Sequence, residues 1–235
     1  MTRLDDQVVV AEQYACEDNL RARQALYEET EGTQPHDVLR SALSALAPAR
    51  VLEVGGGQGE LAEWMRDELG AQVSFLDFSP RMVELACARG LDARVGDVQE
   101  LPFADASFDV VVAAWMLYHV PDVALGLREI ARVLVPGGSL VAVMVSVEHP
   151  RELRELVQYP PGRETTFNRE NGEELLAAEF ARVERRDANV TVTVRDRGKL
   201  VAYRDSMQIP VAPVPDAVEL PFIVDARTSI FVAMR

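Results

Sequence analysis

From residue 37 onward, the hydrophobic pattern of the chain switches repeatedly between the period of a helix and the continuous apolar runs of buried strands. Apolar residues recur at helical spacing within segments 37–46, 61–69, 80–89 and 121–134. The segments with strand character are 50–54, 71–76, 91–96, 108–114 and 139–147. Strands and helices that alternate in this order form an open, mostly parallel sheet with helices on both faces. The sequence therefore predicts a doubly wound α/β fold.

The hydrophobic patterns of helices and strands are weaker after residue 148. Helices are expected at 173–180 and 198–207, and strands at 182–194 and 228–234. Four prolines lie between the last helix and the last strand, which indicates a loop. A chain of 235 residues is long enough for one large domain with a small appendage.

Composition narrows the classes of partner. The longest apolar run, 110–117, is far shorter than the roughly 18 residues of a membrane span, and acidic residues interrupt the N-terminus before a signal-peptide core can form. We therefore expect a cytoplasmic protein with no membrane partner. Cys16 and Cys87 belong to no metal-binding pair, so no metal is expected. The net charge of −14 disfavours a nucleic-acid partner and favours a small-molecule substrate.

A glycine-rich turn follows the first strand and leads directly into a helix. Glycines at such a junction let a ligand approach the backbone closely. The pattern Gly57-x-Gly59-x-x-Ala62, with Asp77 18 residues after Gly59, satisfies the dinucleotide fingerprint. The pattern Glu53-x-Gly55-x-Gly57-x-Gly59 satisfies the acidic-led signature of enzymes that bind S-adenosylmethionine (SAM) instead. Taken alone, the motif leaves both cofactors open.

Four segments together resemble the class I SAM-dependent methyltransferases of the small UbiE, or type 11, kind. They are VLEVGGGQG at 51–59, DFSPRM at 77–82, GDVQELPF at 96–103 and LREIARVLVPGG at 127–138, in the order and spacing of the family. The resemblance implies a Rossmann-like sheet of seven strands with the last one antiparallel, a helical cap or lid at 1–47, and a SAM-binding domain at 48–235. Within that domain, 148–226 would contribute elements on the substrate side. It also implies methyl transfer from SAM to oxygen, nitrogen or carbon of a small molecule.

The resemblance assigns cofactor contacts to particular residues. Asp77 would accept both ribose hydroxyls, because an ionised carboxylate is an acceptor only. Glu53 would lie near the methionine ammonium, and Asp97 would accept from the adenine amino group. The other positions expected at the cofactor are Gly55, Gly57, Gly59, Phe78, Met82, Val98 and Ala113.

Residues on the acceptor side are expected where the fourth strand ends, because open α/β folds bind ligands at the carboxyl edge of the sheet. His119 is the candidate general base, since imidazole can take a proton near neutral pH, and Tyr118 lies beside it. Tyr14, Trp115 and His149 are the expected substrate contacts. Residues 113–116 lack the polar-Pro-Pro-aromatic tetrad of family members that methylate amines, which argues against amine or amide acceptors.

Three other functions compete with this interpretation. A short-chain dehydrogenase is excluded, because its catalytic tyrosine precedes a lysine by four residues and the only lysine, Lys199, has Arg195 there. A non-catalytic SAM-binding regulator or assembly partner stays open. An RNA methyltransferase of the same fold is disfavoured by the acidic charge.

Overall fold

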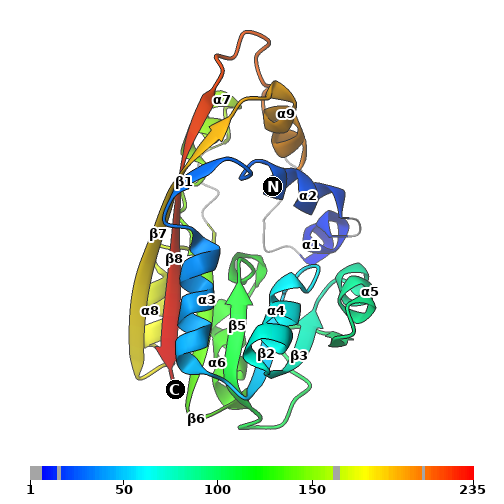
Figure 1. Cartoon of the computed structure of the whole chain (residues 1–235), viewed down its shortest axis with the longest axis vertical. Helices are drawn as coiled ribbons and strands as arrows, with labels where there is room; N and C mark the ends of the chain where they lie inside the picture. Colours follow the sequence, from blue (N-terminus) through cyan, green and yellow to red (C-terminus); the bar gives the residue numbers. More distant parts are fainter. Residues whose placement is uncertain (1–6, 15–16, 161–164, 208–209) are drawn as a thin grey trace.

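The computed structural model describes residues 7–14, 17–160, 165–207 and 210–235. One twisted sheet runs through the molecule, and a group of helices lies above the carboxyl ends of its parallel strands (Figure 1). We call the helices α1 (Gln7–Gln13), α2 (Asp18–Ala25), α7 (Arg151–Leu156) and α9 (Arg197–Asp205) the cap.

The described residues form an eight-stranded sheet in which five adjacent strands, reaching to one edge, are parallel. From one edge to the other, its strands are β1 (Thr30–Gly32), β7 (Arg182–Val194), β8 (Phe222–Met234), β6 (Leu134–Val145), β5 (Phe108–Ala114), β2 (Arg50–Val54), β3 (Gln72–Asp77) and β4 (Asp92–Val95). Strand β8 runs antiparallel to both of its neighbours. The expected Rossmann-like fold with an antiparallel last strand is confirmed, with the short edge strand β1 added to the seven that were expected.

Helices cover both faces of the sheet. The helices α3 (Pro35–Leu46), α4 (Glu60–Leu69) and α5 (Pro80–Ala88) pack on one face, and α6 (Val123–Val133) and α8 (Gly172–Ala177) pack on the other. Local signals set these boundaries: the Ser79 hydroxyl accepts from the backbone N–H of Met82 at the start of α5, with Pro80 in the first turn. Helix α3 packs on the face of β6, β7 and β8 and does not lie above the sheet. Of the segment 1–47 that was expected to form a cap, only residues before Pro35 can therefore belong to it.

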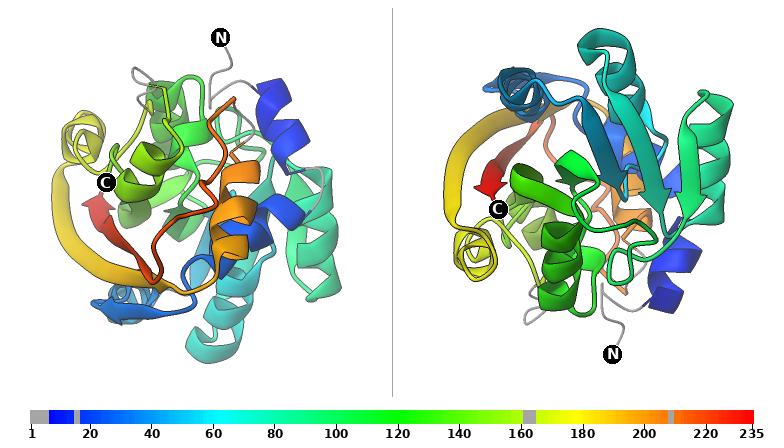
Figure 2. Two further views of the ribbon diagram at one scale, coloured as in Figure 1. Left: turned by 90° about the horizontal axis from the view of Figure 1, so that it is seen from above. Right: turned by 90° about the horizontal axis from the view of Figure 1, so that it is seen from below.

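The strands β7 and β8 form a long hairpin that continues past the parallel strands. Their pairing extends from Arg182 with Met234 to Val194 with Phe222, so β8 begins six residues before the expected residue 228. The extended ends pack with α7, α9 and the end of α2 in one apolar cluster, which includes Leu26, Leu153 and Leu200. Seen from above, α9 and α2 lie over the carboxyl ends of the parallel strands (Figure 2). Among the described residues, no helix has the length and apolar character that a membrane span requires.

Candidate functional site

The glycine-rich turn after β2 and the turn after β3 meet at the Asp77 carboxylate. The backbone N–H of Gly57 donates to Oδ2 at 3.2 Å, and that of Ser79 donates to Oδ1 at 2.9 Å. Gly57 has a φ of +58°, which glycine adopts without strain. Burial raises the pKa of Asp77 to about 6, and the two backbone donors oppose that rise. The carboxylate is thus fixed in place with lone pairs left to accept from a ligand.

Glu53 lies directly beneath the glycine-rich turn, and its side chain is buried. Its Oε2 has no hydrogen-bond partner among the described residues. Burial and, secondarily, the nearby charge of Asp77 raise the pKa of Glu53 to about 8. A Cβ atom on Gly56 would lie 2.5 Å from Glu53 Cδ, so only glycine lets the turn cover this carboxyl. An enclosed carboxyl oxygen without a donor suits a cationic or hydrogen-donating ligand group.

Asp97 follows β4 and lies beside the strand that carries Asp77, because the backbone N–H of Gly96 donates to the Asp77 carbonyl at 3.0 Å. Its Oδ1 accepts from the backbone N–H of Gln99 at 2.9 Å, which closes the turn. Its Oδ2 accepts from the side-chain amide of Gln7 in α1 at 2.9 Å. The structure therefore places Asp97 at the contact between the cap and the turns that follow β3 and β4.

The loop after Asp97 is held by charged residues of α6. Glu129 accepts from the backbone N–H of Leu101 at 2.9 Å, and Arg132 donates to the carbonyls of Leu101 and Phe103 at 3.0 and 2.8 Å. Arg132 is in turn paired with Glu129 at 2.8 Å. These contacts give a physical reason why the GDVQELPF and LREIARVLVPGG segments occur together.

The remaining expected cofactor positions differ in exposure. Phe78 is exposed beside Asp77, as a wall for a planar ligand group requires. Met82 is buried in the protein interior, so its side chain serves packing in this structure. The side chains of Val98 and Ala113 are buried too, but the contacts expected of these two residues involve the backbone N–H of Val98 and the backbone carbonyl of Ala113. Gly55 and Gly59 both have positive φ values, 63° and 78°, and shape the turn.

His119 ends the short 3-10 helix η1 (Leu117–His119), which follows β5 at the carboxyl edge of the sheet. Its Nε2 lies 3.0 Å from the hydroxyl of Tyr14 at the end of α1. The Tyr118 ring lies against the His119 ring, with 4.1 Å between centroids. Burial raises the pKa of Tyr14 far above its ordinary value, so this phenol is protonated at any physiological pH. The structure brings together three of the residues expected at the acceptor.

A second tyrosine–histidine couple lies in the same region. The Tyr27 hydroxyl is 2.5 Å from Nε2 of His149, which follows β6. Burial and the neighbouring Arg154 lower the pKa of His149 to about 4, so the ring is neutral at pH 7. Its Nδ1 is enclosed and has no partner among the described residues. Sequence reasoning missed Tyr27, because nothing in the pattern around it distinguishes it from a surface residue.

Trp115 takes a different position from the other expected acceptor contacts. It has a φ of +53° immediately after β5, and its ring packs against His36 of α3 with 4.9 Å between centroids. The side chain therefore contributes to the packing of α3 on the sheet.

Several contacts hold the helices α1 and α2 against the turns that follow β2 and β3. The Ser79 hydroxyl donates to the Tyr14 carbonyl at 2.8 Å, and Arg81 of α5 is ion-paired with Glu17. The Leu20 side chain is the described group nearest to the position of a Cβ on Gly57, at 3.5 Å. These contacts place the start of the cap directly against the turns that follow β2 and β3.

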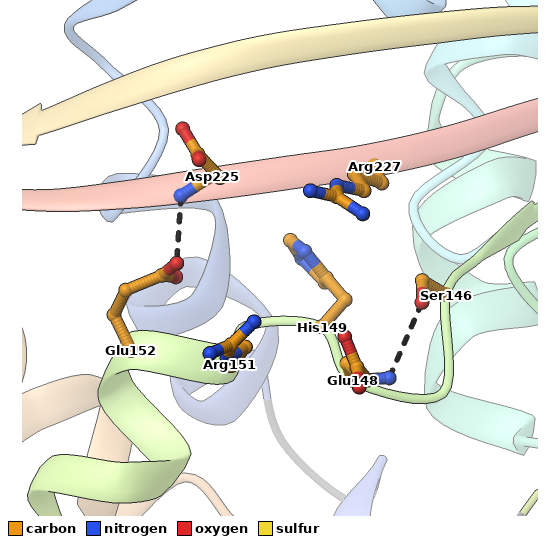
Figure 3. Close-up of a pocket in the computed structure, with 7 residues that line it drawn as sticks. All are labelled: Ser146, Glu148, His149, Arg151, Glu152, Asp225 and Arg227. Atoms are coloured by element: carbon orange, nitrogen blue, oxygen red, sulfur yellow. Dashed lines mark hydrogen bonds between the residues drawn. The ribbon is translucent and has the colours of Figure 1, made fainter.

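A small polar pocket lies beside His149, between the β6–α7 turn and β8 (Figure 3). It is lined by Ser146, Glu148, His149, Arg151, Glu152, Asp225 and Arg227. Its three carboxyl groups nearly balance its two guanidinium groups, and none of the expected cofactor residues lines it. Among the described residues, no cluster of histidine, cysteine or acidic side chains could hold a metal ion.

Comparison with known proteins supports the resemblance found in the sequence. Residues 52–142 match the family described as a methyltransferase domain. A ubiquinone biosynthesis O-methyltransferase of Xanthomonas oryzae is 46% identical over 107 residues, which cover 43% of this chain and 44% of that protein. A demethylmenaquinone methyltransferase of Thermus thermophilus is 39% identical over 104 residues, covering 41% and 47%. The matched part of this chain thus spans less than half the length of these relatives.

A solved structure shows the same fold over the whole chain. Phosphoethanolamine N-methyltransferase 2 of Haemonchus contortus superimposes with a TM-score of 0.65 at 17% identity, covering 100% of this chain and 60% of that one. The resemblance to class I SAM-dependent methyltransferases of the UbiE kind is confirmed for the matched segment.

Proposed function

We propose that this chain, whose residues 52–142 are a class I methyltransferase domain, transfers a methyl group from SAM to a phenolic oxygen of a small molecule. The observation that carries the proposal is the convergence of two kinds of group above the sheet. Buried carboxyls that suit the cofactor, Glu53 and Asp77, lie at the glycine-rich turn, and the Tyr14–His119 couple lies next to it, because the Tyr14 carbonyl accepts from the Ser79 hydroxyl in the turn after Asp77. The names of two relatives point to quinone biosynthesis, which favours a hydroxylated ring as acceptor.

The residues present fit SAM. Asp77 keeps free lone pairs for ribose hydroxyls, and the unpartnered Oε2 of Glu53 matches an ammonium group. Asp97 can accept from the adenine amino group where it now accepts from Gln7. When bound, SAM supplies an electrophilic methyl group on a sulfonium centre. The acidic side chains suit this cationic cofactor better than they suit the pyrophosphate of a dinucleotide.

The chain's own contribution is to position the acceptor, exclude water and accept a proton. The cap helix α2 lies over the glycine-rich turn, where Leu20 approaches Gly57. Holding the reacting atoms in contact beneath it would supply several kcal/mol of the rate enhancement, on the order of 7 or more in well-oriented systems. An acceptor hydroxyl that takes the place of Tyr14 at Nε2 of His119 would give its proton to that nitrogen. Tyr14 would then orient the imidazole or the acceptor oxygen.

The main alternative is a SAM-binding protein without catalysis. The Tyr14–His119 couple favours catalysis, because a purely binding protein has no need for a base at the acceptor side. The acidic net charge of −14 also disfavours an RNA methyltransferase, which must bind a polyanion.

Two measurements test the proposal. Calorimetric titration should show binding of SAM and S-adenosylhomocysteine and none of NAD; binding of NAD alone would overturn the cofactor. Mass spectrometry should then detect S-adenosylhomocysteine formed from SAM in the presence of catechol, hydroquinone or 1,4-dihydroxynaphthalene. Tight SAM binding without turnover of any phenol would favour the non-catalytic alternative.

A further inference from the structure

Both ends of the short helix α1 contact residues that the proposed function uses. At its start, the side-chain amide of Gln7 donates to Asp97 Oδ2 at 2.9 Å. Just after its last residue, the hydroxyl of Tyr14 lies 3.0 Å from His119 Nε2. The Tyr14 N–H donates to the Val10 carbonyl at 3.1 Å, so the helical hydrogen bonding continues to Tyr14. At a rise of about 1.5 Å per residue, one continuous helical segment of roughly 10 Å joins the two contacts.

The described contacts of Asp97 fill its acceptor positions. Its Oδ1 accepts from the backbone N–H of Gln99 at 2.9 Å and from the side-chain amide of Gln99 at 3.2 Å. Its Oδ2 lies 3.0 Å from the same amide nitrogen and accepts from Gln7 at 2.9 Å. Gln99 is itself held in place, because its Oε1 accepts from the backbone N–H of Asp122 at 2.9 Å. Since an ionised carboxylate has about four acceptor positions, an adenine amino group can bind Asp97 only if Gln7 withdraws.

Each end of α1 presents the kind of group that a ligand would bring. The amide of Gln7 is a planar NH2 donor, as is the amino group of adenine. Tyr14 is a phenol, and its hydroxyl lies at the nitrogen to which a phenolic acceptor would give its proton. SAM would thus compete with one end of the helix and the acceptor with the other. Because one helix carries both competing groups, release of either end lowers the free-energy cost of releasing the other.

We propose that α1 is an autoinhibitory latch whose Gln7 and Tyr14 ends occupy the positions of the adenine amino group of SAM and of the acceptor hydroxyl. The identity of these two ligands rests on the proposed function. The Gln7 contact is exposed, whereas the Tyr14 end is also held by the Ser79 hydroxyl, which donates to the Tyr14 carbonyl at 2.8 Å. The Gln7 end therefore opens first. Its withdrawal when SAM binds Asp97 loosens the helix and makes His119 accessible, so the two ligands bind with positive cooperativity.

Gln7→Ala tests the latch without any ligand, because the contact is removed at one end of α1 and the effect is measured at the other. The protein is treated at pH 7 with diethyl pyrocarbonate, which acylates accessible neutral imidazole, and mass spectrometry follows each histidine. We expect His119 to react about threefold faster in Gln7→Ala, the effect of losing one exposed hydrogen bond. His149 is the internal control, since its Nε2 is bonded to Tyr27, which lies outside α1. Glu12→Ala, at an exposed position of α1, is the matched control variant and should change neither rate.

Calorimetric titration with S-adenosylhomocysteine is the second measurement. Gln7→Ala should bind this ligand about threefold more tightly than the unmodified protein does, a small change beside the losses expected where a residue contacts SAM. Glu12→Ala should bind it normally. The direction of the change is decisive, because a glutamine that contacts bound adenine would make Gln7→Ala bind more weakly.

The outcomes separate the latch from the proposed function. Measurable but weaker or unchanged binding of S-adenosylhomocysteine by Gln7→Ala overturns the latch, and so does an unchanged rate at His119, even if the protein methylates a phenol. Tighter binding together with faster modification of His119 supports it. If neither the unmodified protein nor Gln7→Ala binds S-adenosylhomocysteine, the proposed function fails, whereas faster modification of His119 in Gln7→Ala still supports a latch that covers this histidine.

Discussion

Asp77 and Asp97 each accept a hydrogen bond from a backbone N–H of the turn next to them, whereas Tyr14 and Tyr27, which follow the cap helices α1 and α2, are each paired with a histidine far away in the sequence. Asp77 accepts from the N–H of Ser79, two residues away, and Asp97 accepts from that of Gln99. Tyr14 and Tyr27 are bonded to histidines that lie 105 and 122 residues away in sequence. The positions of the two carboxylates are therefore determined by short sequence motifs. The positions of the two tyrosine–histidine couples depend on how distant parts of the chain pack together.

This contrast implies a division of roles. Changes on the cofactor side should alter SAM affinity first, because the groups that would contact SAM are set locally. Changes in the cap should alter turnover or acceptor affinity and leave SAM affinity nearly unchanged. Substitutions on each side can therefore confirm the division or break it.

Gly57→Val should have the largest effect, a loss of measurable SAM binding. A branched side chain at a φ of +58° is strained. It would also lie between the glycine-rich turn and Leu20 of the cap, where SAM is proposed to contact the backbone of the turn. Calorimetry measures the binding. Gly137→Val is the matched control, because Gly137 also has a positive φ, 80°, but nothing described lies within 4 Å of its Cβ position. Equal losses in the two variants would mean that backbone strain alone explains the result.

His119→Asn should reduce turnover by about a hundredfold while SAM affinity is retained, since asparagine is polar but cannot act as a base. The rate of the unmodified protein should rise with pH as the imidazole loses its proton, and this rise should be absent in the variant. Rates of S-adenosylhomocysteine formation across pH 5 to 9 test both points. His36→Asn, which changes an exposed histidine packed on Trp115, should leave the rate unchanged. A normal rate in His119→Asn would mean that His119 is not a general base and that the protein accelerates methyl transfer only by positioning the acceptor and SAM.

The sequence predicted the part of the fold whose signals are local. The strand at 108–114 and the helix that begins at Pro80 were predicted at their observed positions, because a continuous apolar run and a Ser-Pro cap are sufficient to define them. The sequence did not predict β1, which has only three residues and no apolar run and is held by pairing with β7. The start of β8 was missed because Phe222 and Ile223 follow a proline-rich loop and form a strand only by pairing with β7.

The same distinction holds within the site. Glu53 and Asp77 were found from the glycine-rich motif, and the structure places them beneath the turn as that motif requires. Tyr27 could not be found, since its contact with His149 joins residues 122 positions apart and depends on how the segment after α2 packs against the turn after β6. Trp115 was expected at the acceptor from its position after β5, but its left-handed backbone conformation directs it toward α3.

Asp77→Asn should weaken SAM binding by at least about tenfold and leave the acceptor side unaffected. The substitution keeps the size of the side chain and one oxygen, but it removes the negative charge that strengthens hydrogen bonds from ribose hydroxyls, each worth about 1.5–3 kcal/mol when charge-assisted. Calorimetric titration with SAM measures the change. Asp92→Asn, at an exposed aspartate of β4 paired with Arg94, is the control and should bind SAM normally. Normal SAM affinity in Asp77→Asn would mean that Asp77 only stabilises the two turns through its hydrogen bonds with Gly57 and Ser79.

Glu53→Gln should have the smallest effect of these substitutions. It should raise the stability of the folded protein and lower its affinity for SAM, so the two measurements change in opposite directions. The pKa of Glu53 is raised from 4.5 to about 8 in the folded protein, so between those pH values the folded state holds more protons than the unfolded state. Stability without cofactor must therefore fall as pH rises through this window, and the loss is complete above about pH 8. Glutamine cannot ionise, so the variant should be more stable by about 1–3 kcal/mol at pH 8.5 and nearly unchanged at pH 5. Thermal unfolding at both pH values measures this difference, which corresponds to a rise of several degrees, roughly 2–4 °C per kcal/mol in a chain of this size. Glu68→Gln, at an exposed glutamate of α4, should show no such pH dependence of stability.

SAM affinity should fall in Glu53→Gln, because the cofactor's ammonium loses its counter-charge. A variant that is both more stable and a weaker binder would show that the cofactor side retains a destabilising buried acid for the sake of its ligand, whereas a flat pH response would mean that Glu53 ionises normally in the folded protein.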